Sequence, residues 1–137
     1  MMVAVHALTG AVLGGFCRSK SQAFLAGAAS HLLADALPHR DLEVPAEAAL
    51  LGAALATVAL LKGVRSREFA GAVGAAAPDL ENLVACLFHL PDEKLLVPSH
   101  RLYHGRKVQD PNPQIVLATL CVALLAAPAC RPAEPAP

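Results

Sequence analysis

Five long apolar runs, separated by short polar or proline-containing breaks, dominate this sequence. The runs are about 16 to 22 residues long and cover residues 1–17, 22–37, 45–61, 69–90 and 114–130. Alanine and leucine, which favour helices, supply most of their apolar content, whereas β-branched and aromatic residues are scarce. The sequence therefore predicts an all-α chain that folds as a small bundle of about five helices.

Few charged residues interrupt these runs, and this scarcity predicts a membrane-embedded bundle. Only 16% of the residues are charged, against about 25% in an average soluble domain. A helix crosses a bilayer with roughly 20 residues, and the runs are close to that length. The runs 1–17, 45–61 and 114–130 also show no polar stripe at helical period, which a water-exposed helix needs.

We therefore expect a multi-pass membrane protein of the prokaryotic inner-membrane type. Residues 1–131 would form one helical membrane domain, and the proline-rich residues 132–137 a tail. A compact soluble bundle with structural histidines is the alternative, because runs of this length also occur as buried core helices.

Charge and cysteine content exclude several other classes of protein. Lysine plus arginine and aspartate plus glutamate both number 11, so the chain has no electrostatic footprint for nucleic acid. The cysteines lie far apart without a C-x-x-C pair, unlike those of a zinc ribbon or a disulfide framework. Each lies in or beside an apolar run, where a thiol behaves as a small hydrophobe: Cys17, Cys86, Cys121 and Cys130.

Prolines mark several of the predicted helix ends. Pro38 should end the second helix, because proline disfavours helical geometry at the residue before it. Pro45 is well placed for the start of the third helix. Pro78, followed by Asp79, lies inside the fourth run, so we expect helix four to be broken there.

Histidine and aspartate residues recur at helical spacing within or near the apolar runs. In SHLLADALPHRD, His31 and Asp35 are four residues apart and share one helix face, and His39 lies at or just beyond the helix end. His100 and His104 repeat this spacing in SHRLYHG, within the polar stretch 91–113. Imidazole nitrogen and carboxylate oxygen are ligands of zinc, and they also suit manganese or iron.

Two further candidate ligands lie apart from these pairs, His6 in the first run and Asp79 in the fourth. In an up-and-down bundle, the start of helix one and the end of helix two share one end. Helix four runs toward that end with Asp79 midway along it, and the segment with His100 and His104 follows on that side. Ionisable residues in apolar helices are costly and tend to be paired or functional. The combination predicts a metal site, although each residue alone could be a hydrogen-bonded core group, a helix-start acid or part of a solvated loop.

At SHLLADALPHRD, APDLEN and SHRLYHG, the chain resembles the YdjM-like family of predicted membrane-bound metal-dependent hydrolases. That family looks related to the helical zinc-dependent phospholipase C and P1-nuclease-like proteins. The resemblance covers about residues 1–105 and implies these metal-site positions: His6, His31, Asp35, Asp79, His100 and His104. Two features depart from the family pattern: S-H-x-x-x-D precedes the other motifs here, and P-D-x-D-H is reduced to Pro-Asp-Leu-Glu-Asn.

The expected function is that of a membrane-bound metal-dependent hydrolase, with one or two divalent ions, zinc above all. His39 would complete the ligand shell, and Glu81 would act as a base or as a partner of a ligand. Arg101 and Arg106 could hold a phosphate oxygen. A phosphoester such as a lipid headgroup is the substrate class that the resemblance implies. The alternative is a non-catalytic membrane protein that binds or handles metal through the same ligands.

Overall fold

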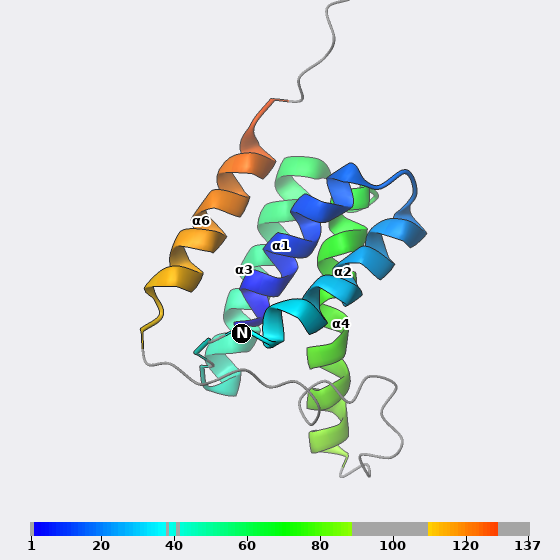
Figure 1. The fold of residues 1–137 in the computed structure, drawn as a ribbon. Helices are drawn as coiled ribbons and strands as arrows, with labels where there is room; N and C mark the ends of the chain where they lie inside the picture. Colours follow the sequence, from blue (N-terminus) through cyan, green and yellow to red (C-terminus); the bar gives the residue numbers. More distant parts are fainter. Residues whose placement is uncertain (1, 38, 41, 89–109, 129–137) are drawn as a thin grey trace, which may run out of the picture.

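A computed structural model describes residues 2–37, 39–40, 42–88 and 110–128, and this part of the chain is all-helical (Figure 1). Five helices follow one another along it, and their bounds are α1 Val3–Phe16, α2 Lys20–Asp35, α3 Val44–Lys62, α4 Arg67–Leu87 and α6 Asn112–Ala126. The predicted class, a small helical bundle of about five helices, is confirmed.

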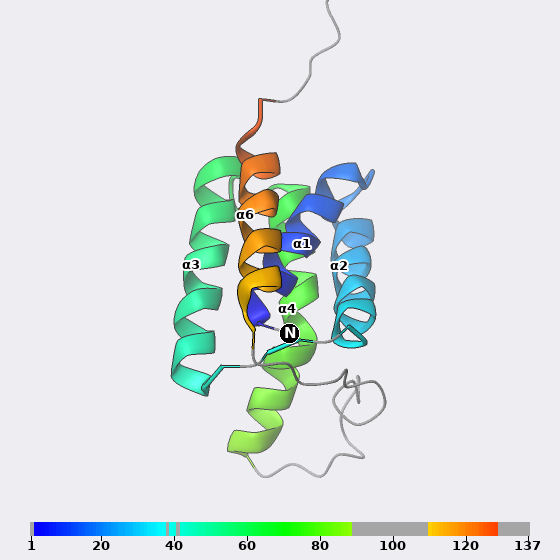
Figure 2. The same cartoon turned by 60° about the vertical axis from the view of Figure 1, so that its left-hand side comes forward.

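Helix α1 lies at the centre of the bundle and contacts all four other helices. Helices α2 and α4 pack against α1 and against each other on one side, and α3 and α6 lie on the other side (Figures 1 and 2). The start of α1, the end of α2 and the middle of α4 meet at the lower end of the bundle in both views. This is the arrangement that the up-and-down topology predicts.

Local side-chain chemistry explains several helix ends. The hydroxyl of Ser19 accepts a hydrogen bond from the Gln22 N–H at 3.2 Å and caps α2. Ser66 does the same for α4, where it accepts from the Phe69 N–H at 2.9 Å. Helix α3 ends at Gly63, whose φ of 88° lies in the left-handed region that glycine adopts without strain.

The expected break at Pro78 is wrong, because α4 continues through this residue to Leu87. An interior proline removes one hydrogen bond and costs a helix about 3 kcal/mol. The turns just before Pro78 are packed tightly against α1 and α2, where Ala72, Ala75 and Ala76 are buried. This packing favours the helical path and offsets the lost bond, so tertiary contacts override the local preference.

Glycines allow the backbones of α1, α2 and α4 to come into direct contact. A Cβ atom on Gly71 would overlap the carbonyl oxygen of Gly10, and one on Gly27 would overlap that of Gly71. A Cβ atom on Gly74 would overlap the carbonyl oxygen of Phe24. Only glycine fits at these crossings, so the sequence fixes how closely the three helices approach.

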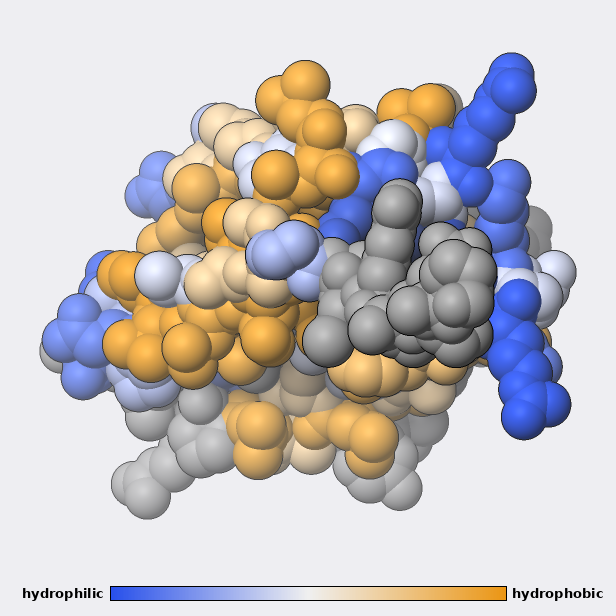
Figure 3. All heavy atoms as spheres, turned by 90° about the horizontal axis from the view of Figure 1, so that it is seen from above, coloured by the Kyte–Doolittle hydropathy of each residue, from blue (hydrophilic) through white to orange (hydrophobic). Residues whose placement is uncertain are grey.

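Helices α3 and α6 bury little of their apolar surface. Within α3, only Ala54 and Val58 are buried, and Leu60 is 88% exposed. Seen along the bundle from above, hydrophobic residues cover much of the left and centre of the visible surface, and hydrophilic residues lie mainly on the right and at the left margin (Figure 3). Exposed apolar residues on the two helices include Leu50, Leu60, Leu61, Ile115, Val116, Leu120 and Leu124.

In the described part of the chain, α3 alone is long and apolar enough to cross a membrane. Helices α1 and α6 are apolar but have only 14 and 15 residues. At 1.5 Å per residue they span about 21 to 23 Å, short of the roughly 30 Å hydrocarbon layer. Helix length therefore does not support the predicted multi-pass arrangement.

Candidate metal centre

Three helices bring buried histidines and carboxylates together at the lower end of the bundle. His6 lies in the first turns of α1, and His31 and Asp35 lie in the last turns of α2. Asp79 lies in the middle of α4, directly after Pro78. His6, His31 and Asp35 are at most 1% exposed, and the Asp79 side chain is 13% exposed. Burial of this kind is costly for groups that carry charge, so it indicates a specific use.

Asp35 contacts both histidines. Its Oδ1 atom accepts a hydrogen bond from His6 Nε2 at 3.0 Å. Its Oδ2 atom lies 3.2 Å from His31 Nε2, within ion-pair distance. The two imidazole rings are tilted by 33° with their centroids 4.1 Å apart. One carboxylate thus links residues from α1 and α2.

His31 also contacts α4 through its other ring nitrogen. Nδ1 donates to the backbone carbonyl oxygen of Ala75 at 2.9 Å and lies 3.7 Å from Asp79 Oδ2. A carbonyl oxygen only accepts hydrogen bonds, so Nδ1 must carry a proton in this arrangement. Pro78 lies in the same turn of α4 and has no N–H, so one helical hydrogen bond is absent there.

One nitrogen of His6, one nitrogen of His31 and one oxygen of Asp79 lie within 4.8 Å of one another. Zinc holds nitrogen and oxygen ligands at about 2.0–2.2 Å, so the ligand atoms of one tetrahedral ion are roughly 3.3 Å apart. A contraction of at most about 1.5 Å would bring the three atoms to that spacing. His6, His31 and Asp79 therefore form a group that could hold a metal ion.

The surroundings set the charges of this group. Burial acts to raise the pKa of Asp35, but the interactions with His31 and His6 outweigh it and hold the pKa well below its usual range. Burial lowers the pKa of His6, and the hydrogen bond to Asp35 opposes this only in part. At neutral pH, Asp35 is therefore an anion and His6 is a neutral imidazole with a lone pair to offer.

Two polar side chains that the sequence analysis did not single out hold the start of α1 in place. Glu47 of α3 accepts hydrogen bonds from the backbone N–H groups of Val3 at 2.8 Å and Leu42 at 2.9 Å. Gln114 of α6 accepts from the Met2 N–H at 2.9 Å and donates to the Arg40 carbonyl at 3.1 Å. Glu47 is the charged residue of the apolar run 45–61, and a carboxylate in such a run was the sequence feature that could have indicated its structural role.

Among the described residues, the group does not include the predicted site residues His39 and Glu81. His39 is buried beyond the end of α2, and its Nδ1 donates to the Leu37 carbonyl oxygen at 2.7 Å. Glu81 follows Asp79 by two residues, which turns it about 200° around α4 from that carboxylate. His100, Arg101, His104 and Arg106 lie outside the described residues, and their roles stay predictions.

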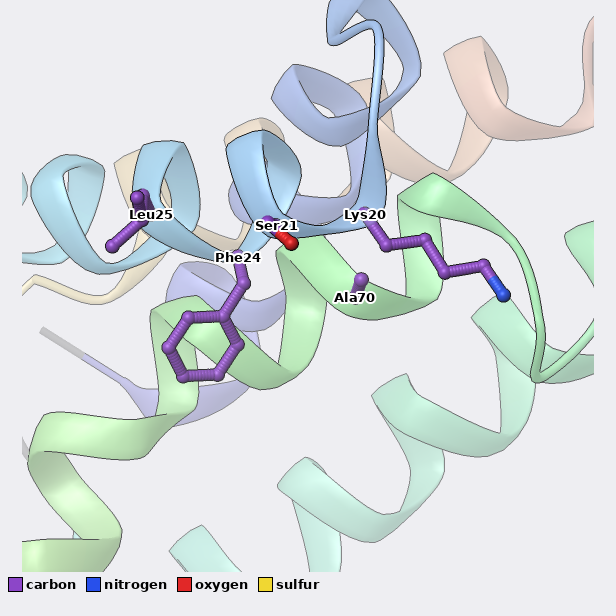
Figure 4. Close-up of a pocket in the computed structure, with 5 residues that line it drawn as sticks. All are labelled: Lys20, Ser21, Phe24, Leu25 and Ala70. Atoms are coloured by element: carbon purple, nitrogen blue, oxygen red, sulfur yellow. The ribbon is translucent and has the colours of Figure 1, made fainter.

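A surface hollow at the other end of α2 is separate from the histidine group. Lys20, Ser21, Phe24, Leu25 and Ala70 line it (Figure 4). Lys20 precedes His31 by 11 residues, or about 16 Å along the helix. The lining side chains include no candidate metal ligand, so the hollow does not extend the metal centre.

Comparisons with protein-family models, with curated proteins and with solved structures found no match. The buried histidines and carboxylates of α1, α2 and α4 therefore carry what can be inferred about function.

Proposed function

We propose that this protein is a metal-dependent hydrolase whose divalent ion, zinc, is held by His6, His31 and Asp79. The observation that carries the proposal is the group of two buried histidines and one carboxylate drawn from three helices. Two imidazoles and one carboxylate are also a donor set found in catalytic zinc sites. Three protein ligands leave a fourth position, which water or substrate occupies in such sites.

The chemistry of the site follows from its ligands and its burial. A bound zinc ion supplies Lewis acidity and lowers the pKa of bound water towards neutrality. Asp79 is the most exposed member of the group at 13%, so substrate and water approach from its side. His6 and His31, at 1% and 0% exposure, close the opposite side. The ionised Asp35 adds negative charge behind the histidines and strengthens them as ligands.

The proposed substrate is a phosphoester. This class comes from the resemblance to membrane-bound metal-dependent hydrolases at the histidine and aspartate motifs. In the proposal, His100 and His104 add ligands for the same ion or for a second one, and Arg101 and Arg106 hold a phosphate oxygen. Glu81 keeps its proposed part as a base or as a partner of a ligand.

The proposed location is a membrane, with the outer apolar surface of α3 and α6 against lipid. Leu60 and Leu124 are 88% and 62% exposed, and they belong to a larger set of exposed leucine, isoleucine and valine residues on these helices. Soluble monomers rarely expose continuous apolar surface of this kind.

A non-catalytic metal-binding protein is the second candidate, and one distance favours it. Asp35 Oδ2 lies 3.2 Å from His31 Nε2, close to the spacing of two ligands on one zinc ion. If Asp35 joined the three other ligands, the shell would be closed and no position would remain for water. A closed shell argues for storage or structure rather than hydrolysis.

Metal content and phosphodiester hydrolysis, measured on the same preparations, test the proposal. Protein purified in detergent should hold one or two zinc ions per chain by plasma mass spectrometry, and it should cleave a nitrophenyl phosphodiester with that ion. His31→Ala and Asp79→Ala should lose both properties, whereas Glu43→Gln, at an exposed position, should keep both. Bound metal without hydrolysis would favour the storage function, and no metal after reconstitution would refute both functions.

A further inference from the structure

The hydrogen bond between His6 and Asp35 identifies which nitrogen of His6 carries the proton. Nε2 of His6 lies 3.0 Å from Asp35 Oδ1, and both side chains are 1% exposed. The carboxylate oxygen of Asp35 accepts this bond, so Nε2–H of His6 is the donor. A neutral imidazole carries one proton, which makes Nδ1 the atom with the lone pair.

The Nδ1 atom of His6 is buried and has no hydrogen-bond partner within the described part of the chain. A buried acceptor without a partner costs about 1–3 kcal/mol. The same ring belongs to the group whose ligand atoms lie within 4.8 Å of one another. A cation at that position would satisfy the lone pair, and no rearrangement of the His6–Asp35 bond would be needed.

His31 provides an internal comparison, because a different group accepts from its ring. Its Nδ1 donates to the carbonyl of Ala75 at 2.9 Å, so Nδ1 of His31 carries a proton. The two neighbouring rings thus donate from different nitrogens, His6 from Nε2 to a carboxylate of α2 and His31 from Nδ1 to a backbone carbonyl of α4.

We propose that Asp35 is a positioning residue, which holds His6 in the Nε2–H tautomer so that His6 binds the metal ion through Nδ1. This rests on the proposed function only in assuming that the group holds a metal. Metal-bound histidines commonly donate their other N–H to a carboxylate, which fixes the ring and makes it a stronger ligand.

Nitrogen NMR on metal-free protein tests the tautomers directly. Long-range proton–nitrogen correlation spectra of the 15N-labelled chain should show His6 protonated at Nε2 and His31 protonated at Nδ1. Leucine is similar in size to aspartate but cannot accept a hydrogen bond. In Asp35→Leu, His6 should therefore lose its preference for a proton on Nε2, while His31 should keep the proton on Nδ1. A wild-type His6 protonated at Nδ1 would overturn the proposal.

Zinc affinity, measured by competition with a chelating dye, separates positioning from direct ligation. Asp35→Leu should weaken zinc binding 10- to 100-fold. Asp35→Asn keeps an oxygen that accepts from His6 Nε2–H, so it should retain the tautomer and recover most of the affinity. If Asp35→Asn loses as much affinity as Asp35→Leu, Asp35 is a ligand and the proposal is wrong.

The two proposals fail in different ways. A wild-type protein that binds no zinc, or binds it without hydrolysing a phosphodiester, contradicts the proposed enzyme whatever the tautomers are. The spectra of wild-type protein need no metal and no variant, so they decide the tautomer of His6 even if Asp35→Leu does not fold.

Discussion

The two sides of the bundle use apolar residues in opposite ways. On the α1–α2–α4 side, glycines bring backbones into contact, and buried polar groups link the helices. On the α3–α6 side, large aliphatic residues point outwards, and Gln114 is the buried polar residue of these two helices within the described chain. Close packing therefore coincides with the site, and exposed apolar surface lies away from it.

This difference shows what a polar cluster needs from its scaffold. The hydrogen bonds of His6 and His31 tolerate displacements of only a few tenths of an ångström. Backbone contact between glycines sets the helix separation more rigidly than flexible leucine side chains would. The outer faces of helices α3 and α6 hold no buried hydrogen bonds that require a fixed helix separation. Their residues are therefore available for contact with lipid or another surface.

The largest expected effect on stability comes from adding a Cβ atom at a glycine where two helix backbones are in contact. Gly71→Ala would place a Cβ atom against the Gly10 carbonyl oxygen and push α4 away from α1. Overpacking of a tight interior typically costs about 1–3 kcal/mol, and backbone contact on both sides puts this site at or above the upper end. Urea unfolding followed by circular dichroism measures the loss.

Gly52→Ala is the matched change on the other side of the bundle. Its Cβ atom would meet nothing within 4 Å among the described residues, and Gly52 lies inside α3. Alanine favours a helix over glycine by about 0.5–1 kcal/mol, so this variant should be slightly more stable than wild type. Equal effects of Gly71→Ala and Gly52→Ala would remove the distinction between the two sides.

The next largest effect concerns the link between the two sides. Glu47→Ala removes the acceptor for the Val3 and Leu42 N–H groups, which fixes the start of α1 near His6. Loss of these partly buried bonds should cost about 1–2 kcal/mol and weaken zinc binding. Glu43→Ala is the control, because Glu43 is exposed and its side chain does not cap α3. A similar loss of stability in both variants would show that removal of a negative charge, rather than loss of the two hydrogen bonds of Glu47, causes the effect.

A smaller effect should appear when metal-free protein is acidified. Burial lowers the pKa of His6 in the folded state, so the unfolded chain, with a histidine pKa near 6.5, binds the proton first. Stability therefore falls as the pH falls below about 7, by at most about 1.3 kcal/mol between pH 7 and 5.5 for one proton. Because the pKa of Asp35 is low, this residue changes the stability only below about pH 4, where aspartate in the unfolded chain binds protons. It therefore does not contribute between pH 7 and 5.5.

Denaturant titrations at several pH values check this, and His6→Gln should flatten the dependence between pH 7 and 5.5. An unchanged slope in His6→Gln would assign the effect to another group. The prediction sharpens the comparison, because the buried titratable His and Asp side chains of the described chain all lie outside α3 and α6.

The sequence predicted the helical class and the convergence of His6, His31, Asp35 and Asp79, because helical spacing is a local property and short connections make consecutive helices antiparallel neighbours. It did not predict the continuity of α4 at Pro78, since packing of Ala72, Ala75 and Ala76 decides it. It also could not show that Asp35 forms a hydrogen bond with His6, which lies 29 positions earlier in the sequence. Long-range partners depend on helix rotation and separation, which the glycine crossings set in three dimensions.

The smallest effect on stability is expected from the double variant Leu60→Ser, Leu124→Ser. Both side chains point away from the bundle, so their loss should change the free energy of unfolding in detergent by less than about 0.5 kcal/mol. Binding to lipid vesicles should nevertheless fall, because each buried leucine contributes about 1.5–3 kcal/mol when it leaves water. Vesicle flotation measures this, and Glu43→Ala should float like wild type. A large loss of stability with unchanged flotation would place these leucines in a protein interior, and the α3–α6 side would then resemble the α1–α2–α4 side after all.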